Sequence, residues 1–124
     1  MKIKFRKFSV EEINVEIGKL SSMRQRVDQL TVSVQEEVGF YTQLNGRLLS
    51  IIDHTANNSS VLQLSNSANA IGSFLQHKER AGIERAVMSN TFATDKFTGA
   101  LYIKFIALIT EQNTYFSNFS MLVR

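Results

Sequence analysis

The hydrophobic residues of this chain recur at spacings of three and four along most of its length, which places them on one face of an α-helix. Ser9 and Glu12 have the spacing of a capping box. Phe8 and Ile13 have the spacing of a hydrophobic staple, so the first helix is predicted to begin at Ser9. The apolar stripe of this helix consists of Ile13, Ile17, Leu20, Arg24 and Val27. Arg24 is its one charged member.

A break is predicted near residues 28 to 33, with a single long helix as the alternative. The β-branched run Thr31–Val34 weakens the helix there, and Ser33 with Glu36 forms a second capping box. The second helix is expected to stop near Thr55, within a polar turn that extends from His54 to Ser60. Its inward residues are expected to be Val34, Val38, Tyr41, Leu44, Leu48, Ile51 and Ile52.

Two further helices are predicted, one from about Ser60 to Asn90 and one from about Thr98 to the end, with a break over Thr91–Gly99. The inward set of the third helix is Val61, Leu64, Ala68, Ile71, Leu75, Ile83 and Val87. The fourth carries a heptad stripe, flanked by Ile106, Ile109 and Phe116, which consists of Leu101, Phe105, Leu108, Gln112, Tyr115, Phe119 and Leu122.

The four amphipathic segments predict an all-α fold, an antiparallel up-down four-helix bundle, because short connections place successive helices antiparallel. The chain has no proline and only six glycines, which fits long helices better than an all-β fold. Its 124 residues are the size of one domain. We therefore expect residues 1–124 to form a single helical domain.

Composition excludes several classes of protein. A content of 44% hydrophobic and 20% charged residues supports a packed core. There is no apolar run of about 18 residues and no apolar core of a signal peptide. The net charge of +3 is too dispersed to indicate a nucleic-acid partner. The basic segment Met1–Lys7 is interpreted as a solvated end, with a membrane-surface or nucleic-acid arm as the alternative.

The sequence offers little for catalysis. Cysteine is absent, which excludes thiol nucleophiles and thiolate metal sites. His54 and His77 lack the carboxylate spacing of bundle metal sites, and no nucleophile motif or phosphate-binding glycine loop is present. We therefore predict no enzyme activity, no metal and no cofactor.

The segment Gln76–Arg85 gathers Lys78, Arg80 and Arg85 within little more than two helical turns. Guanidinium groups at a helix–helix seam suit a planar oxyanion, because their rigid fork can donate two parallel hydrogen bonds. Arg24 is a further candidate ligand. The alternative is a solvated face in which Arg80 pairs with Glu84 at i,i+4 and Arg24 extends its charge to water.

The stretch Lys78–Phe97, with the sequence KERAGIERAVMSNTFATDKF, resembles the signature segment of the nitrate- and nitrite-sensing (NIT) domain of bacterial methyl-accepting chemotaxis proteins. Met23–Asp28 and Tyr41–Asn45 resemble that family as well. One departure is that the upstream Glu-Arg-Gly motif of the family is not found before Ser9.

This resemblance implies the ligand-sensing domain of a chemoreceptor, part of a longer extracytoplasmic module that binds nitrate or nitrite between helices and signals by helix displacement. It also implies a periplasmic location, a membrane-anchored parent protein and a homodimer. The family's site arginine corresponds to Arg80 in Glu79-Arg80-Ala81-Gly82. The competing hypothesis is a ligand-free structural or dimerisation bundle.

Overall fold

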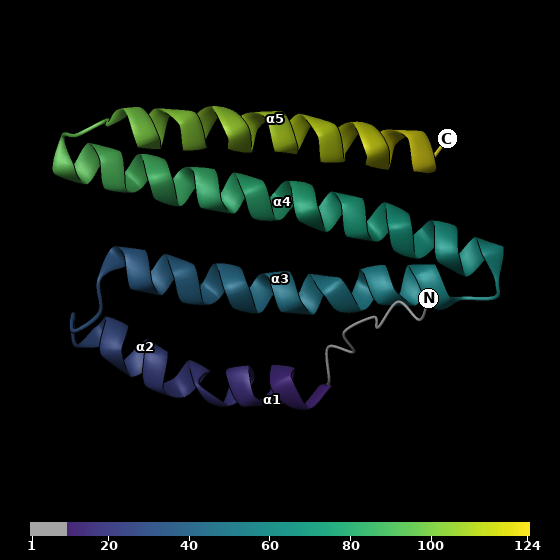
Figure 1. The fold of residues 1–124 in the computed structure, drawn as a ribbon, viewed down its shortest axis with the longest axis horizontal. Coiled ribbons are helices and arrows are strands. Elements are labelled where there is room, and N and C mark those ends of the chain that lie inside the picture. The colour runs from purple at the N-terminus through teal and green to yellow at the C-terminus, as the bar shows by residue number, and fades with distance from the viewer. Residues whose placement is uncertain (1–9) are drawn as a thin grey trace, which may run out of the picture. The chain divides into compact units, whose positions relative to one another are not determined.

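The computed structural model describes residues 10–124, and every regular element within them is an α-helix (Figure 1). The helices are α1 (Val10–Gly18), α2 (Leu20–Asp28), α3 (Val34–Asn58), α4 (Leu62–Thr94) and α5 (Gly99–Leu122). The predicted signals at Phe8 and Ser9 and the basic segment Met1–Lys7 lie outside the described residues. The chain divides into two units, one ending at Leu48 and the other comprising Leu49–Arg124, and α3 contributes to both.

In the first unit, the predicted first helix is two helices. The break falls at Lys19, whose N–H donates to the carbonyl of Glu16 at 3.1 Å, three residues back rather than four. Gly18 precedes it, and glycine is a poor helix former because its backbone is unusually free. A turn of this tighter kind advances the following side chains around the helix axis.

That advance changes which side chain of α2 is buried. Met23 is buried and Arg24 is exposed, so the prediction that Arg24 lies on the apolar stripe is wrong. Leu20 and Val27 are half-buried, as the stripe predicted, whereas Ile17 is exposed. The tighter turn at Lys19 therefore replaces an arginine by a methionine on the packed face.

The predicted break before α3 is confirmed, and the chain reverses direction across it. Leu30 takes a left-handed backbone conformation with φ of 55°. Ser33 caps α3, because its Oγ accepts a hydrogen bond from the N–H of Glu36 at 3.1 Å. Arg26 on α2 closes the turn by donating from Nη1 to Oε1 of Glu36 at 2.6 Å.

In the second unit, α3 continues to Asn58, so the turn predicted from His54 to Ser60 begins too early. Thr55 donates from Oγ1 to the carbonyl of Ile51 at 2.9 Å, and Asn58 donates from Nδ2 to the carbonyl of His54 at 2.7 Å. These side chains bond to helix carbonyls instead of competing for backbone groups in a turn. His54 therefore lies in a helix, and the connection to α4 shortens to residues 59–61.

Small residues bring the end of α3 against the start of α4. Ala56 is 2% exposed, and its carbonyl accepts a hydrogen bond from Oγ of Ser65 at 2.6 Å. A Cβ placed on the buried Gly72 would lie 3.4 Å from Cγ2 of Ile52. The two helices pack where side chains are short, so larger apolar residues lie beside the contact rather than in it.

The predicted inward sets are confirmed only in part. The predicted positions that are buried are Ile13, Leu44, Ala68, Val87 and Leu108. The predicted positions that are exposed are Ile17, Val34, Leu48, Ile51, Val61, Leu64, Ile71 and Leu122. Buried positions that the pattern missed include Ala70, Gly72 and Thr91 on α4.

Helices α4 and α5 form an antiparallel hairpin joined by residues 95–98 (Figure 1). Asp95 ends α4 in the left-handed region with φ of 50°, and Oγ1 of Thr98 caps α5 by accepting from the N–H of Leu101 at 3.3 Å. Six of the seven residues of the predicted heptad stripe are buried or half-buried: Leu101, Phe105, Leu108, Gln112, Tyr115 and Phe119.

The all-α fold class is confirmed, and the connections that precede α3, α4 and α5 each reverse the chain, as an up-down bundle requires. None of the helices within residues 10–124 is long and apolar enough to cross a membrane.

Candidate functional site

Three of the four predicted basic ligands lie on α4, namely Lys78, Arg80 and Arg85. The structure places them on different faces of that helix. Arg80 is half-buried, whereas Lys78 and Arg85 are exposed. At 3.6 residues per turn, Lys78 and Arg85 lie roughly 140–160° around α4 from Arg80. They share a face with each other and not with Arg80. Arg24 is exposed on α2 in the first unit.

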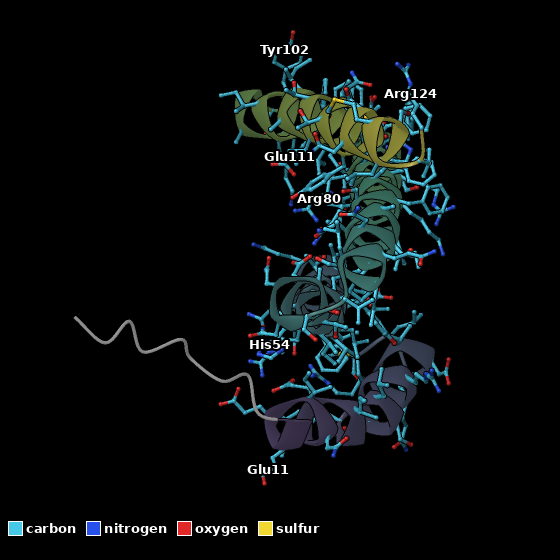
Figure 2. The ribbon with its side chains drawn as sticks, turned by 90° about the vertical axis from the view of Figure 1, so that its right-hand side faces the viewer. Glu11, His54, Arg80, Tyr102, Glu111 and Arg124 are labelled. Atoms are coloured by element: carbon cyan, nitrogen blue, oxygen red, sulfur yellow. The ribbon has the colours of Figure 1, made fainter. Side chains whose placement is uncertain are left out.

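Arg80 lies where α4 meets α5 (Figure 2). Its Nε donates to Oε2 of Glu111 on α5 at 2.8 Å, and its Nη1 donates to Oε1 of Gln76 on α4 at 2.6 Å. Its Cζ lies 5.2 Å from the centre of the Tyr115 ring, within the range of a cation–π contact. Two of the five N–H groups of a guanidinium are used by these two hydrogen bonds, which leaves capacity for a further acceptor.

A second set of polar side chains lies beside this one. Gln112 donates from Nε2 to Oε2 of Glu84 at 2.5 Å. His77 Nδ1 lies 3.0 Å from the carbonyl oxygen of Gln112, and because a carbonyl only accepts, Nδ1 carries the proton. We call the two sets together the polar seam: Gln76, His77, Arg80, Glu84, Glu111, Gln112 and Tyr115.

The polar seam differs from the solvated pair that the alternative hypothesis described. Arg80 forms its ion pair across the helices with Glu111, while Glu84, four residues along α4, accepts from Gln112. The side chain of Arg80 is 24% exposed and that of Glu111 is 50% exposed. An ion pair this exposed contributes only about 0–1 kcal/mol to stability, so an external anion can compete with Glu111 for the guanidinium.

The sequence singled out Arg80 as a candidate ligand but did not connect it with Glu111. Glu111 lies 31 residues further along the chain, and no local motif connects it to Arg80. Gln112 was visible as the polar member of an otherwise apolar heptad stripe. A polar side chain at such a position needs a hydrogen-bonding partner, and this was the available signal for a polar contact between α4 and α5.

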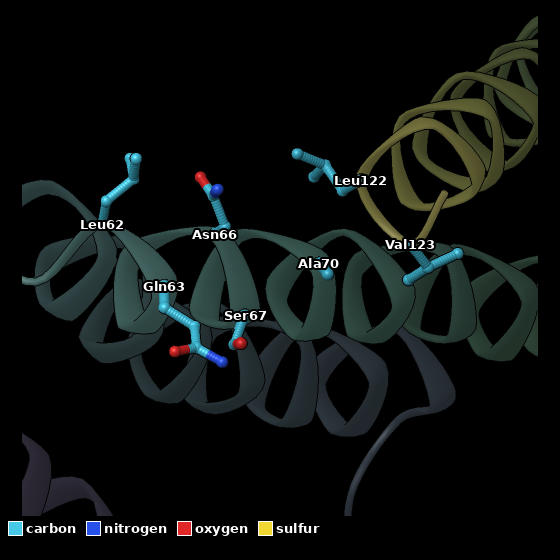
Figure 3. A pocket seen from close by; sticks show the side chains of 7 residues that line it. All are labelled: Leu62, Gln63, Asn66, Ser67, Ala70, Leu122 and Val123. Atoms are coloured by element: carbon cyan, nitrogen blue, oxygen red, sulfur yellow. The ribbon is translucent and has the colours of Figure 1, made fainter.

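A pocket of about 460 Å³ opens at the end of the α4–α5 hairpin that lies away from the turn of residues 95–98, between the first turns of α4 and the end of α5 (Figure 3). Its lining residues are Leu62, Gln63, Asn66, Ser67, Ala70, Leu122 and Val123. None of them is charged, so the pocket offers an anion no counter-charge. Within residues 10–124, no three His, Asp or Glu side chains gather closely enough to hold a metal ion.

Comparisons with known proteins agree with the resemblance in the sequence. The family described as nitrate and nitrite sensing matches residues 6–123. The chain is 28% identical over 108 residues to a protein named nitrate regulatory protein from Klebsiella oxytoca, which covers 87% of this chain and 27% of that protein. The chain therefore spans about a quarter of the length of this relative. No solved structure matches the chain significantly.

Proposed function

Because the chain belongs to the family of nitrate- and nitrite-sensing domains, we propose that it binds a small planar oxyanion at Arg80. The observation that carries the proposal is the contact between Arg80 Nε and a carboxylate oxygen of Glu111 at 2.8 Å. Nitrate, nitrite and carboxylate each present oxygen atoms in one plane around a central atom. A guanidinium that already engages one such group has the geometry to engage another.

The surroundings of Arg80 favour this role over a purely structural one. Burial reduces the screening of its charge by water, while partial exposure leaves a route for a small ion. Gln76 and Tyr115 hold the guanidinium from its own helix and from α5. The other predicted ligands, Lys78, Arg85 and Arg24, are proposed as supporting cations. Their exposed charges attract an anion to the protein, but they do not contact the anion that is bound at Arg80.

The signal in this proposal is a displacement of helices. Arg80 belongs to α4 and its carboxylate partner to α5, so a ligand at Arg80 changes a contact between two helices. A ligand shifts the balance between two arrangements only by its difference in affinity for them, typically about 1–3 kcal/mol. A small sliding of α5 along α4 is consistent with a coupling of that size.

The wider context is proposed from the resemblance. The segment Lys78–Phe97 resembles the signature found in methyl-accepting chemotaxis proteins, and we propose a membrane-anchored chemoreceptor as the parent protein, with this domain in the periplasm as a homodimer. The relative from Klebsiella oxytoca is named nitrate regulatory protein, and a regulatory output in place of chemotaxis is the competing proposal. Inserting an enzyme that is active only outside the cytoplasm into the parent protein directly after Arg124 tests the location of this domain; an inactive fusion contradicts it.

Calorimetric titration with nitrate and with nitrite tests the binding site. Arg80→Ala is expected to weaken binding by at least about tenfold, because a hydrogen bond to a charged group contributes roughly 1.5–3 kcal/mol. Arg80→Lys is expected to fail as well, since an ammonium lacks the planar fork. Arg124→Ala, which removes the same charge at the exposed end of the chain, serves as the control and is expected to bind normally.

A ligand-free structural bundle gives different results. In that case neither anion binds, and Arg80→Ala changes only stability, by a few tenths of a kcal/mol as is usual for an exposed ion pair. Circular dichroism of each variant separates loss of binding from loss of fold. Normal binding by a folded Arg80→Ala protein would remove Arg80 from the site.

A further inference from the structure

We propose that Glu111 is an internal anion that occupies Arg80 in the absence of ligand, and that a bound oxyanion must displace it. The proposal rests on the proposed function of Arg80 and adds the residue with which the ligand competes. Glu111 then helps to determine the affinity for the oxyanion. Its release from Arg80 is the first step by which binding of the oxyanion affects α5.

The contacts of Arg80 support an exchange of partners. The carboxylate of Glu111 accepts from Nε at 2.8 Å, along an edge of the guanidinium that a bound nitrate or nitrite would also use. The other two contacts do not involve Glu111: Nη1 donates to Gln76, and the ring of Tyr115 lies 5.2 Å from Cζ. Arg80 therefore stays in position when Glu111 leaves, and one acceptor can replace the other.

The exposures of the two partners indicate which one moves. The side chain of Glu111 is 50% exposed, against 24% for Arg80. A carboxylate that is half in water regains hydration readily on release, whereas a half-buried guanidinium left without an anion does not. An oxyanion that replaces Glu111 thus satisfies Arg80 while Glu111 is satisfied by water.

Displacement would loosen only one of the links between α4 and α5. The bond from Gln112 to Glu84 and the bond from His77 to the carbonyl of Gln112 do not use Arg80. Phe74 and Phe119 still pack with ring centres 5.3 Å apart. The hairpin therefore remains assembled, and the ligand changes its register or tilt rather than opening it.

Glu84 provides a matched control for Glu111. Both are acidic residues of the polar seam, and replacement of either by glutamine removes one negative charge at nearly constant shape. Glu84 differs because its Oε2 accepts from Gln112 and not from Arg80. A general effect of charge on anion affinity appears in both variants, whereas competition for Arg80 appears only in Glu111→Gln.

The experiment is a calorimetric titration, with nitrate and with nitrite, of the unmodified protein, Glu111→Gln, Glu84→Gln and Arg80→Ala. Glu111→Gln is expected to bind roughly two- to fivefold more tightly than both the unmodified protein and Glu84→Gln. This change corresponds to about 0.4–1 kcal/mol, within what an ion pair this exposed contributes. Equal or weaker binding by Glu111→Gln overturns the proposal.

The side-chain carboxyl carbon resonance of Glu111 gives a second measurement. Nitrate added to the unmodified protein is expected to shift this resonance as the carboxylate leaves Arg80, while that of Glu84 stays nearly unchanged. A Glu111 resonance that does not move at saturating nitrate contradicts displacement. If Arg80→Ala loses binding while Glu111→Gln keeps an unchanged affinity, only the role of Glu111 is overturned. If Arg80→Ala binds normally, or if none of the four proteins binds either anion, the proposed function is overturned as well.

Discussion

Gly82, in the middle of α4, is a site where a single methyl group should stabilise the protein. A Cβ built on Gly82 meets no atom within 4 Å outside its own helical turns and chain neighbours. Alanine therefore adds no clash, and it removes the conformational freedom that makes glycine unfavourable in a helix. The expected gain for Gly82→Ala is about 1 kcal/mol.

Gly72, ten residues earlier on the same helix, is the matched position with a neighbour. A Cβ there would lie 3.4 Å from Cγ2 of Ile52 and 3.5 Å from Oδ1 of Asp53, both on α3. These are ordinary contact distances, so Gly72→Ala should keep a gain of about 0.5–1 kcal/mol. Gly72→Leu cannot fit without moving α3 and should instead cost about 1–3 kcal/mol.

Thermal unfolding followed by circular dichroism compares the three variants with the unmodified protein. For a domain of this size, 1 kcal/mol shifts the Tm by about 3–6 °C, so the two alanine variants should melt higher and Gly72→Leu lower. A stable Gly72→Leu protein would refute the close packing of α3 on α4. A lower Tm for Gly82→Ala would refute the open space beside that residue and indicate that another helix approaches it in solution.

Three further outcomes are expected from individual contacts. Thr98→Ala removes the cap of α5 and should cost about 1 kcal/mol in denaturant unfolding, so an unchanged midpoint would contradict the capping role. The hydrogen bond from Arg26 lowers the pKa of Glu36 below its ordinary value of 4.5. Its stabilising effect is therefore present above pH 4.5 and is lost as the pH falls through the lowered pKa, so Glu36→Gln should reduce the acid sensitivity of unfolding below about pH 4.5. The exposed apolar residues of α5, which include Ile106 and Phe116, should drive self-association, and light scattering that finds a monomer at high concentration would count against it.

Local signals in the sequence predicted the helix boundaries that depend on a single side chain. Ser33 and Thr98 each cap a helix with their own oxygen, and such a cap can be recognised from a few neighbouring residues. The heptad stripe of α5 was also recognisable, because one long helix that packs along one neighbour keeps a constant face. These features depend on residues close together in the sequence.

Features that depend on two helices could not be predicted in the same way. The tighter turn at Lys19 buries Met23 instead of Arg24, although a regular helix would have placed Arg24 on the packed face. Likewise, the apolar spacing of α4 favoured Leu64 and Ile71, which are exposed, but α3 approaches at Gly72, which has no side chain. Hydrophobic periodicity indicates which residues could be buried, and the shape of the neighbouring helix decides which of them are.

The candidate site lies between these two cases. Arg80 was identified from its own segment, whereas its partner Glu111 is fixed by the register of α4 against α5. That register begins at the turn of residues 95–98, where Asp95 ends one helix and Thr98 caps the next. Because each residue of a helix is rotated by about 100° from the last, a one-residue change in this turn would move Glu111 away from Arg80. The turn therefore positions the ion pair although it contacts neither residue, and the caps at Asp95 and Thr98 help to determine which distant side chain meets the arginine.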